Sequence, residues 1–334
     1  MTAVASNQPQ GFVEKSVRAL CSAHPELVSL AADGRTVLRK SQASAKVGLL
    51  SGGGSGHEPL HAGFVGTGML DAAVPGGVFA SPPAGQIVDA TRLVSTGKGV
   101  LMIVKNYTGD VMNFGIAAEL LKSEGIEVAT VIVDDDLASA SDSEDQRSPG
   151  RRGTAAVLAV EKMCGAAAES GADLSSLAAL GKRVAAQSAT LGLAFGPCIN
   201  PETGLAAFEL AEDEIEFGVG IHGERGIEKR PRAELPQLAE QLTLPLIEHL
   251  GLAAGHRVVA IVNGLGGTGH LMLANLQWEV ERILTDRGIH LARVSTGSFV
   301  TSLDMPGLSV TLVSVDDELL ALWDAPVATP TYRW

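Results

Sequence analysis

Short apolar runs alternate with segments of helical periodicity in the first half of the chain. The runs at 46–50, 99–104 and 127–133 contain few polar residues, which is typical of strands covered on both faces in a parallel sheet. The spacing of apolar residues predicts a helix before the first run, at 10–24, and another between the last two runs, at 112–124. Repeated strand–loop–helix units of this length indicate layers of helices on sheets.

The alternation continues to the end of the chain. The further strands are expected at 69–75, 190–195, 215–221, 257–262, 291–294 and 309–313, and the further helices at 81–94, 154–169, 174–187, 233–250, from about 271, and 317–323. We expect two α/β domains with largely parallel or mixed sheets flanked by helices, an N-terminal domain over 1–187 and a C-terminal domain over 188–334. The polar stretch at 139–153 is predicted to be a loop, either a plain surface excursion or a lid.

Charge and cysteine usage narrow the class of protein. The formal net charge is −13, which disfavours a nucleic-acid partner and attraction to an anionic membrane. The three cysteines, Cys21, Cys164 and Cys198, form no paired motif, which predicts reduced thiols. Residues 1–11 lack the basic and apolar regions of a secretory signal, and no uncharged stretch is long enough to span a bilayer. These observations predict a soluble, cytoplasmic protein.

A glycine-rich stretch at 51–61 follows one of the predicted strands. Pro59 suits the first turn of a helix, so we expect a strand–loop–helix turn whose backbone N–H groups face a ligand. The stretch lacks the lysine and hydroxyl of a P-loop, and the dinucleotide pattern GxGxxG fails in register at His57. His57 and His61 match the zinc motif HExxH, but Pro59 interrupts the helix that this motif needs. We therefore expect no metal site.

A second glycine-rich stretch, at 264–269, satisfies the order strand–GxGxxG–helix. The dinucleotide fold also needs an acidic residue at the end of the next strand, where it holds the ribose. Here the strand at 291–294 is followed by Ser295, Thr296 and Gly297. A nicotinamide-dependent oxidoreductase is therefore an alternative that the sequence disfavours, and a plain strand-to-helix turn is the preferred interpretation.

Charged side chains follow two of the most apolar strands. Lys105 and Asp110 come directly after the strand at 99–104, where open α/β sheets bind ligands, and Asp110 also suits a helix cap. The three aspartates at 134–136 are interpreted as a solvated loop and cap rather than as an ion site. His222 lies between glycines at the end of another apolar strand, and we predict that it joins His57 and Asp110 in one site at a domain interface.

Six strings in order resemble one known family. GGGSGHEPLHAGFVG, SPPAGQI, KNYTGDVMNF, EFGVGIHGE, TSLDMPG and DDELLALWDAP look like dihydroxyacetone kinase, specifically its substrate-binding K subunit, and the resemblance runs from about Leu27 to the C-terminus. It implies that His222 adds to the carbonyl of a short ketose to form a hemiaminal. It implies that His57 hydrogen-bonds the carbonyl oxygen and that Asp110 is the base for the terminal hydroxyl.

The resemblance also implies which residues line the pocket and which molecules take part. Lys105 and the backbone of Gly54, Ser55 and Gly56 would line the ketose site. The ligand would be dihydroxyacetone or a related short ketose. No cofactor would bind to this chain, and ATP or ADP with Mg²⁺ would sit on a separate L subunit, which a phosphotransferase-system M subunit recharges in some bacteria. The K subunit of this family is typically a homodimer.

Two turns depart from the family pattern, at 193–201 and 264–270. Because both could reshape the pocket, a four-carbon ketose such as erythrulose stays an alternative to dihydroxyacetone. The family also includes K-like coactivators, which sense the ketose without phosphorylating it. Retention of Asp110 favours the enzyme over such a coactivator, because sensing needs no base for the hydroxyl.

Overall fold

The computed structural model describes residues 11–41, 45–139, 150–201 and 203–334. The chain divides into two compact units, each built from separated stretches. The first-sheet unit comprises Gly11–Asp134, Val157–Ala185 and Asp317–Trp334, and the second-sheet unit includes Asp135–Ala156 and Ala186–Asp316. The predicted boundary at residue 187 lies next to Ala186, where the chain passes from the first-sheet unit to the second-sheet unit. The stretches at 135–156 and 317–334, by contrast, each belong to the other unit from the rest of their half of the sequence. The loop predicted at 139–153 has its centre, 140–149, outside the described residues.

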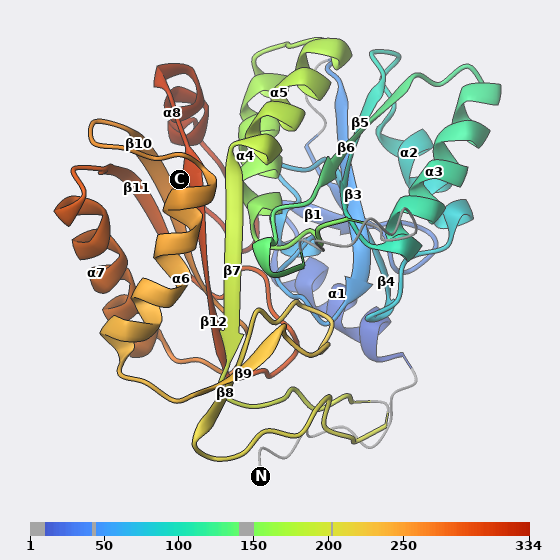
Figure 1. Cartoon of the computed structure of the whole chain (residues 1–334). Helices are drawn as coiled ribbons and strands as arrows, with labels where there is room; N and C mark the ends of the chain where they lie inside the picture. Colours follow the sequence, from blue (N-terminus) through green and yellow to red (C-terminus); the bar gives the residue numbers. More distant parts are fainter. Residues whose placement is uncertain (1–10, 42–44, 140–149, 202) are drawn as a thin grey trace. The chain divides into compact units, whose positions relative to one another are not determined.

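The first-sheet unit contains a mixed six-stranded sheet in the order β1-β2-β4-β3-β5-β6 (Figure 1). β4, β3, β5 and β6 are parallel, and the short β2 pairs antiparallel with both β4 and β1. Its elements are α1 (Phe12–Ala23), β1 (Val28–Leu30), β2 (Val37–Arg39), β3 (Gly48–Ser55), η1 (Ala62–Phe64), β4 (Ala72–Val78), α2 (Ala84–Val94), β5 (Val100–Lys105), α3 (Thr108–Ser123), β6 (Val128–Val133), α4 (Ala156–Glu169), α5 (Leu174–Ala186) and α8 (Asp317–Asp324).

Helices cover both faces of this sheet. α2 and α3 pack their apolar side chains, among them Ile87 and Phe114, on Leu50 of β3 and Met102 of β5. α4 and α5 lie on the opposite face (Figure 1). Since β3 and β5 are covered on both sides, each is buried along its whole length, as their continuous apolar sequence predicts.

The second-sheet unit contains another mixed six-stranded sheet, in the order β11-β10-β12-β7-β8-β9. Only β10 and β11 are paired in parallel among its described strands. α6 and α7 cover one face with leucines such as Leu242 and Leu276. Its elements are η2 (Leu137–Ser139), β7 (Ser188–Ala194), β8 (Glu214–Phe217), β9 (Glu228–Pro231), α6 (Leu235–His249), β10 (Arg257–Gly264), α7 (His270–Asp286), β11 (His290–Gly297) and β12 (Gly307–Ser314).

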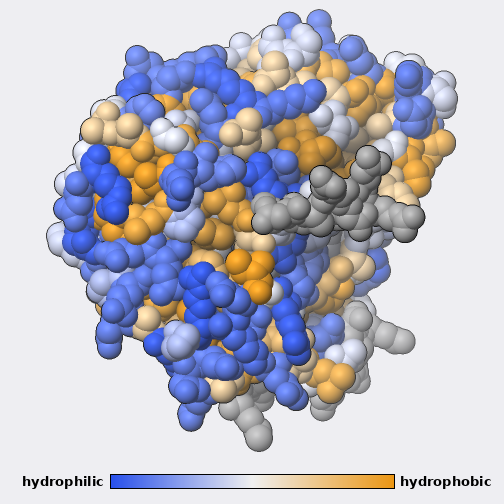
Figure 2. Space-filling model, in the orientation of Figure 1, coloured by the Kyte–Doolittle hydropathy of each residue, from blue (hydrophilic) through white to orange (hydrophobic). Residues whose placement is uncertain are grey.

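The predicted fold class is confirmed, since both units are α/β with mixed sheets flanked by helices. The short strands β1, β2 and β9 were not predicted, because three or four residues carry too little periodicity. On the face drawn in Figure 2, hydrophilic side chains predominate and hydrophobic ones form separate patches between them. Among the described residues, none of the helices has the length and apolarity needed to cross a membrane.

Candidate functional site

The carboxyl ends of two central parallel strands meet in the first-sheet unit. β3 lies between β4 and β5, so the chain leaves β3 to one side and returns to its other side after β4. This change of direction is a topological switch point, where open α/β sheets bind ligands. The glycine stretch ends β3 there, and Lys105 ends β5.

The glycine stretch belongs to the strand itself, which corrects the predicted strand–loop–helix turn. β3 extends through Ser55, residues 57–61 form turns, and only the 3-10 helix η1 follows. The peptide bonds Glu58–Pro59 and Leu60–His61 are both cis. Because turns and η1 follow β3, no α-helix begins at Pro59. For the same reason His57 and His61 do not share a helix face as HExxH requires.

Glycine at position 53 makes room for two charged groups. A Cβ atom on Gly53 would lie 2.5 Å from Lys105 Nζ and 3.2 Å from Asp110 Oδ2. Real Cβ atoms essentially never show contacts under 3.0 Å, so a larger residue at position 53 would displace the end of the Lys105 side chain. The strand backbone thus lies directly against the two predicted functional side chains.

Lys105 and Asp110 are brought together, as the sequence predicts. Lys105 is fully buried and Asp110 is 3% exposed, and the ammonium lies 3.7 Å from the carboxylate oxygen Oδ2. Asp110 is in the first turn of α3, whose N-cap residue is Tyr107, so it is not the helix cap. Burying two charges is costly unless they are paired and hydrogen-bonded. The Lys105–Asp110 pair is therefore a candidate for the functional site.

The lysine is also bound by a histidine that the sequence prediction did not include. Lys105 Nζ lies 2.9 Å from His61 Nε2, and His61 Nδ1 lies 2.5 Å from Glu161 Oε1 of α4. Ser51 Oγ lies 3.0 Å from the same Nδ1 and donates to the carbonyl of Ile103 at 2.7 Å. Glu161 has no exposed surface, and its Oε2 atom has no hydrogen-bond partner among the described residues.

Burial decides the protonation of this histidine and glutamate. Desolvation, together with the Lys105 charge, lowers the pKa of His61 well below its ordinary value. Desolvation raises the pKa of Glu161 to about 8. His61 is therefore neutral at pH 7, and because its Nε2 accepts from the ammonium, its proton lies on Nδ1 and is donated to Glu161. The two residues fix the position of the Lys105 ammonium.

His57 is fully buried in the same unit. Its ring stacks on Phe79, with centroids 5.3 Å apart and planes inclined by 25°. A coulombic contribution from His57 also lowers the pKa of His61, as expected of neighbouring rings. His57 is thus close to the His61–Lys105 pair, although it was predicted from the glycine stretch alone.

The predicted lining residues of the glycine stretch have structural contacts of their own. A Cβ on Gly54 would lie 2.7 Å from the backbone nitrogen of Ala80, and Ser55 Oγ donates to the carbonyl of Gly76 at 2.8 Å. Gly56 has φ of 102° and its N–H donates to Glu58 Oε2 at 2.9 Å. Their role as ligand-lining residues stays a prediction.

A cavity of about 540 Å³ adjoins this stretch. Its walls are largely apolar and come from α1, including Val17 and Leu20, and from the backbone of 52–55. His61 and Glu58 reach its lining, whereas Lys105 and Asp110 are not among its lining residues. The charged pair is therefore separated from this cavity by the strand backbone.

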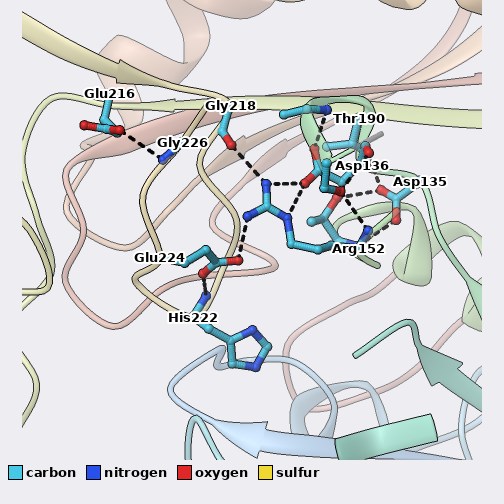
Figure 3. Close-up of polar contacts among 12 residues, drawn as sticks. Asp135, Asp136, Arg152, Thr190, Glu216, Gly218, His222, Glu224 and Gly226 are labelled. Carbon is cyan, nitrogen blue, oxygen red and sulfur yellow. Dashed lines mark hydrogen bonds and ion pairs between the residues drawn. The ribbon is translucent and has the colours of Figure 1, made fainter. Parts of the chain in front are cut away.

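His222 lies in the second-sheet unit, on the loop between β8 and β9. Its backbone N–H donates to Glu224 Oε2 at 2.7 Å, and the other oxygen of Glu224 accepts from Arg152 at 2.9 Å. Figure 3 shows the imidazole of His222 pointing away from the guanidinium of Arg152. Because His222 and His57 belong to different units, their meeting in one site stays a prediction.

The remaining candidate motifs have structural roles. A Cβ on Gly266 would lie 1.9 Å from the carbonyl of Leu303, and one on Gly267 would lie 2.5 Å from that of Asp304, so these glycines serve close packing in the second-sheet unit. The parallel strand β11 ends in Gly297 without an acidic residue. In the described part of the chain, no three His, Cys, Asp or Glu side chains gather to hold a metal ion.

The aspartates after β6 are also held by specific contacts. Asp135 accepts hydrogen bonds from the backbone and hydroxyl of Thr154, from the N–H of Ala156 and from Thr190 Oγ1 at 2.5–3.0 Å. Asp136 pairs with Arg152. Both aspartates are 1% exposed, so they are buried and hydrogen-bonded rather than solvated as predicted.

Comparison with known proteins covers nearly the whole chain. The Dak1 domain family matches residues 18–331. The chain is 42% identical to the "PEP-dependent dihydroxyacetone kinase, dihydroxyacetone-binding subunit DhaK" of Escherichia coli (strain K12), over 98% of each chain.

Two solved structures are similar throughout. The dihydroxyacetone kinase of C. freundii superposes with a TM-score of 0.91 and 33% identity, covering 100% of this chain and 60% of that one. The dihydroxyacetone kinase operon co-activator Dha-DhaQ superposes with a TM-score of 0.89 and 34% identity, covering 94% of this chain and 96% of that one. An enzyme and a co-activator are thus about equally similar in fold.

Proposed function

This chain belongs to the Dak1 domain family, and we propose that it is the ketose-binding catalytic subunit of a dihydroxyacetone-type kinase. Two of the relatives that it matches along nearly their full length are dihydroxyacetone-binding subunits of such kinases, which are transferases. The structural observation that carries the proposal is the buried Lys105–Asp110 pair beneath Gly53. A base and a cation at a topological switch point suit activation of a hydroxyl group.

The first step captures the ketose. A nitrogen of His222 attacks the carbonyl carbon of dihydroxyacetone, and the carbonyl oxygen becomes a hydroxyl with the proton that the imidazole gives up. His57 donates to and accepts from this oxygen. Capture requires a carbonyl group, so glycerol, which has nearly the same shape, gains nothing from it. Holding the ketose covalently also reduces the entropic cost of the transfer that follows.

The second step transfers the phosphoryl group. Asp110 takes the proton of the terminal hydroxyl as its oxygen attacks the γ-phosphorus, and ADP leaves. The buried Lys105 ammonium stabilises negative charge at this point. The nucleotide and Mg²⁺ belong to a separate L subunit, and this chain itself binds no cofactor. The hemiaminal addition then reverses, the bond to His222 breaks and the hydroxyl proton returns to the imidazole, which releases dihydroxyacetone phosphate. Erythrulose is the nearest alternative substrate.

Further partners follow from the same assignment. The chain forms a homodimer, and a phosphotransferase-system M subunit recharges the nucleotide where the donor is phosphoenolpyruvate. That donor is part of the name of the Escherichia coli relative. The subunit acts in the cytoplasm, where phosphorylation brings a short ketose into metabolism.

A non-catalytic ketose sensor is the second candidate, because the co-activator Dha-DhaQ has nearly the same fold. Sensing needs capture of the ketose without transfer. The buried pair favours the enzyme, since a sensor gains nothing from a base placed beside a cation.

The test separates the two steps. Carbonyl-labelled dihydroxyacetone is mixed with the protein, and the carbon NMR spectrum is searched for a protein-bound tetrahedral signal. We expect this signal to vanish in His222→Ala and to persist in His290→Ala, a control at an exposed histidine. With an L subunit and ATP, Asp110→Asn should retain the signal but lose phosphorylation. A signal without phosphorylation by any L subunit would support the sensor, and the absence of any signal with either ketose would refute both.

A further inference from the structure

One arginine ties together both ends of the loop that carries His222. Arg152 Nη2 donates to the carbonyl of Gly218 at 3.0 Å, where the chain leaves β8. Its Nη1 donates to Glu224 Oε1 at 2.9 Å, after the histidine. Figure 3 shows this guanidinium between the two contacts. The fork of donors on arginine suits such a bridge, because separate nitrogens of one rigid group reach the two acceptors.

Glu224 connects Arg152 to the backbone of His222. Glu224 uses one oxygen for Arg152 and the other for the backbone N–H of His222, at 2.7 Å. A Cβ on Gly220 would lie 1.8 Å from Glu224 Oε1, so the carboxylate lies flat against the loop backbone. Arg152, Glu224 and the backbone of His222 therefore form one continuous chain of charge-assisted hydrogen bonds.

The arginine is itself held by a buried carboxylate. Both Nε and Nη2 of Arg152 contact Asp136 Oδ2, at 2.7 and 2.6 Å. The other oxygen, Asp136 Oδ1, accepts the N–H of Ala138 at 3.0 Å. Asp136 is 1% exposed and the Arg152 side chain is 17% exposed. The bridge is thus anchored to the start of η2, outside the loop that it holds.

Without this bridge the loop would have much freedom. Gly218 and Gly223 have φ values of 77° and 74°, and Gly220 and Gly226 lie in the same nine residues, 218–226. Glycines lose the most conformational entropy when they are fixed. Addition of an imidazole to a carbonyl requires close alignment of the two groups, so a loop free to change shape would lower the fraction of competent protein.

We propose that Arg152 and Glu224 are positioning residues that hold the backbone of His222 for capture of the ketose. This inference rests on the proposed function, since it concerns the histidine that forms the hemiaminal. Neither side chain touches the ketose in this proposal. Their effect is on how much of the protein has His222 correctly placed, and therefore on the affinity of capture.

The test titrates carbonyl-labelled dihydroxyacetone into each variant and measures the bound tetrahedral signal. Arg152→Met removes the bridge, and Glu224→Gln keeps its shape but places an N–H₂ group against one of its two donors. We expect both to weaken capture by about tenfold or more, the usual effect of losing a charge-assisted hydrogen bond. The affinity of Arg152→Lys for the ketose should lie between that of these two variants and that of the unmodified protein.

Two controls separate a loss of positioning from unrelated effects of the substitutions. Arg151→Met changes the neighbouring arginine, which contacts His249, and should leave capture unchanged. Circular dichroism checks that each variant is folded, and if Arg152→Met is not, Glu224→Gln decides, because it leaves the Arg152–Asp136 pair in place. In the kinase assay the KM for the ketose should rise more than kcat falls.

Two failures can be told apart. If the unmodified protein shows no tetrahedral signal, the proposed function fails and this inference with it. If the unmodified protein captures the ketose and Glu224→Gln captures it equally well while folded, the positioning role alone is overturned.

Discussion

Replacing Glu161 by glutamine tests the protonation of the buried cluster around Lys105. Glu161 lies 2.5 Å from His61 and has no exposed surface. If burial keeps its carboxyl group protonated at pH 7, glutamine is a close neutral substitute and stability at that pH should change little. If the glutamate were instead ionised and paired with a charged His61, the substitution would leave a buried cation without its partner, at a cost of about 3–5 kcal/mol.

The pKa values set the sign and size of the pH dependence. The pKa of Glu161 is raised to about 8, so between pH 4.5 and 8 the folded state holds a proton that the unfolded state has lost, and stability falls as pH rises. The lowered pKa of His61 acts in the opposite direction, but only below its ordinary value of 6.5. From pH 6.5 to 9 the glutamate alone remains, and its ionisation should cost about 2 kcal/mol.

The measurement is urea denaturation of the unmodified protein and of Glu161→Gln at intervals from pH 6.5 to 9, followed by circular dichroism. The difference between the two free energies of unfolding should grow by about 2 kcal/mol in favour of glutamine across this range. Glu119→Gln, at an exposed position of α3, removes the same charge and should show no such trend. Parallel curves for Glu161→Gln and the unmodified protein would refute the assignment, as would a large loss at pH 7.

Four further substitutions follow from the contacts described. Gly53→Ala should lower kcat/KM at least tenfold by displacing Lys105, while Gly115→Ala, in open space on α3, should stabilise the fold by about 0.5–1 kcal/mol in urea denaturation. Asp71→Asn should cost about 3 kcal/mol of unfolding free energy, because the carboxylate holds two buried cations and a backbone N–H. Asn263→Ala should lower thermal stability by a similar amount, about 3 kcal/mol, since its buried amide makes four hydrogen bonds.

The layered fold could be predicted because its strands are long and apolar. β5 is a run of six buried residues, and a run of this length and apolarity is typical of a strand covered on both faces. The exchange of 135–156 and 317–334 between the units could not be predicted in the same way. Local periodicity gives the type of an element, whereas the unit that an element joins depends on contacts distant in sequence.

The glycine stretch shows where local reasoning failed. Pro59 is favourable in the first turn of a helix, so a helix was predicted there. The actual backbone has a cis peptide before Pro59 and another before His61, and it continues as turns. Glycines 52–54 then lie within β3, where they make close approaches rather than a loop.

Lys105 and Asp110 were predicted as site residues because ligands bind at strand ends in open α/β sheets. The residues that contact Lys105 from elsewhere in the chain were not predicted. Glu161 is 100 residues from His61 in the sequence. One signal was available, since Glu161 and Lys162 interrupt an otherwise apolar stretch of α4. An acidic residue on the buried face of a helix needs a partner, and that requirement could have marked it for attention.

Two cations, the buried Lys105 and the partly buried Arg152, hold residues of proposed function in a similar way. Lys105 lies between His61 and Asp110, and Arg152 lies between Asp136 and Glu224, each within its own unit. Burying such charges adds little to stability, because apolar residues of similar size are often as stabilising. The ionic contacts instead fix the position of particular atoms, which an apolar contact would leave free to move. Placement of the proposed base Asp110 and the proposed nucleophile His222 would be a sufficient reason for a protein to keep charges that its stability does not require.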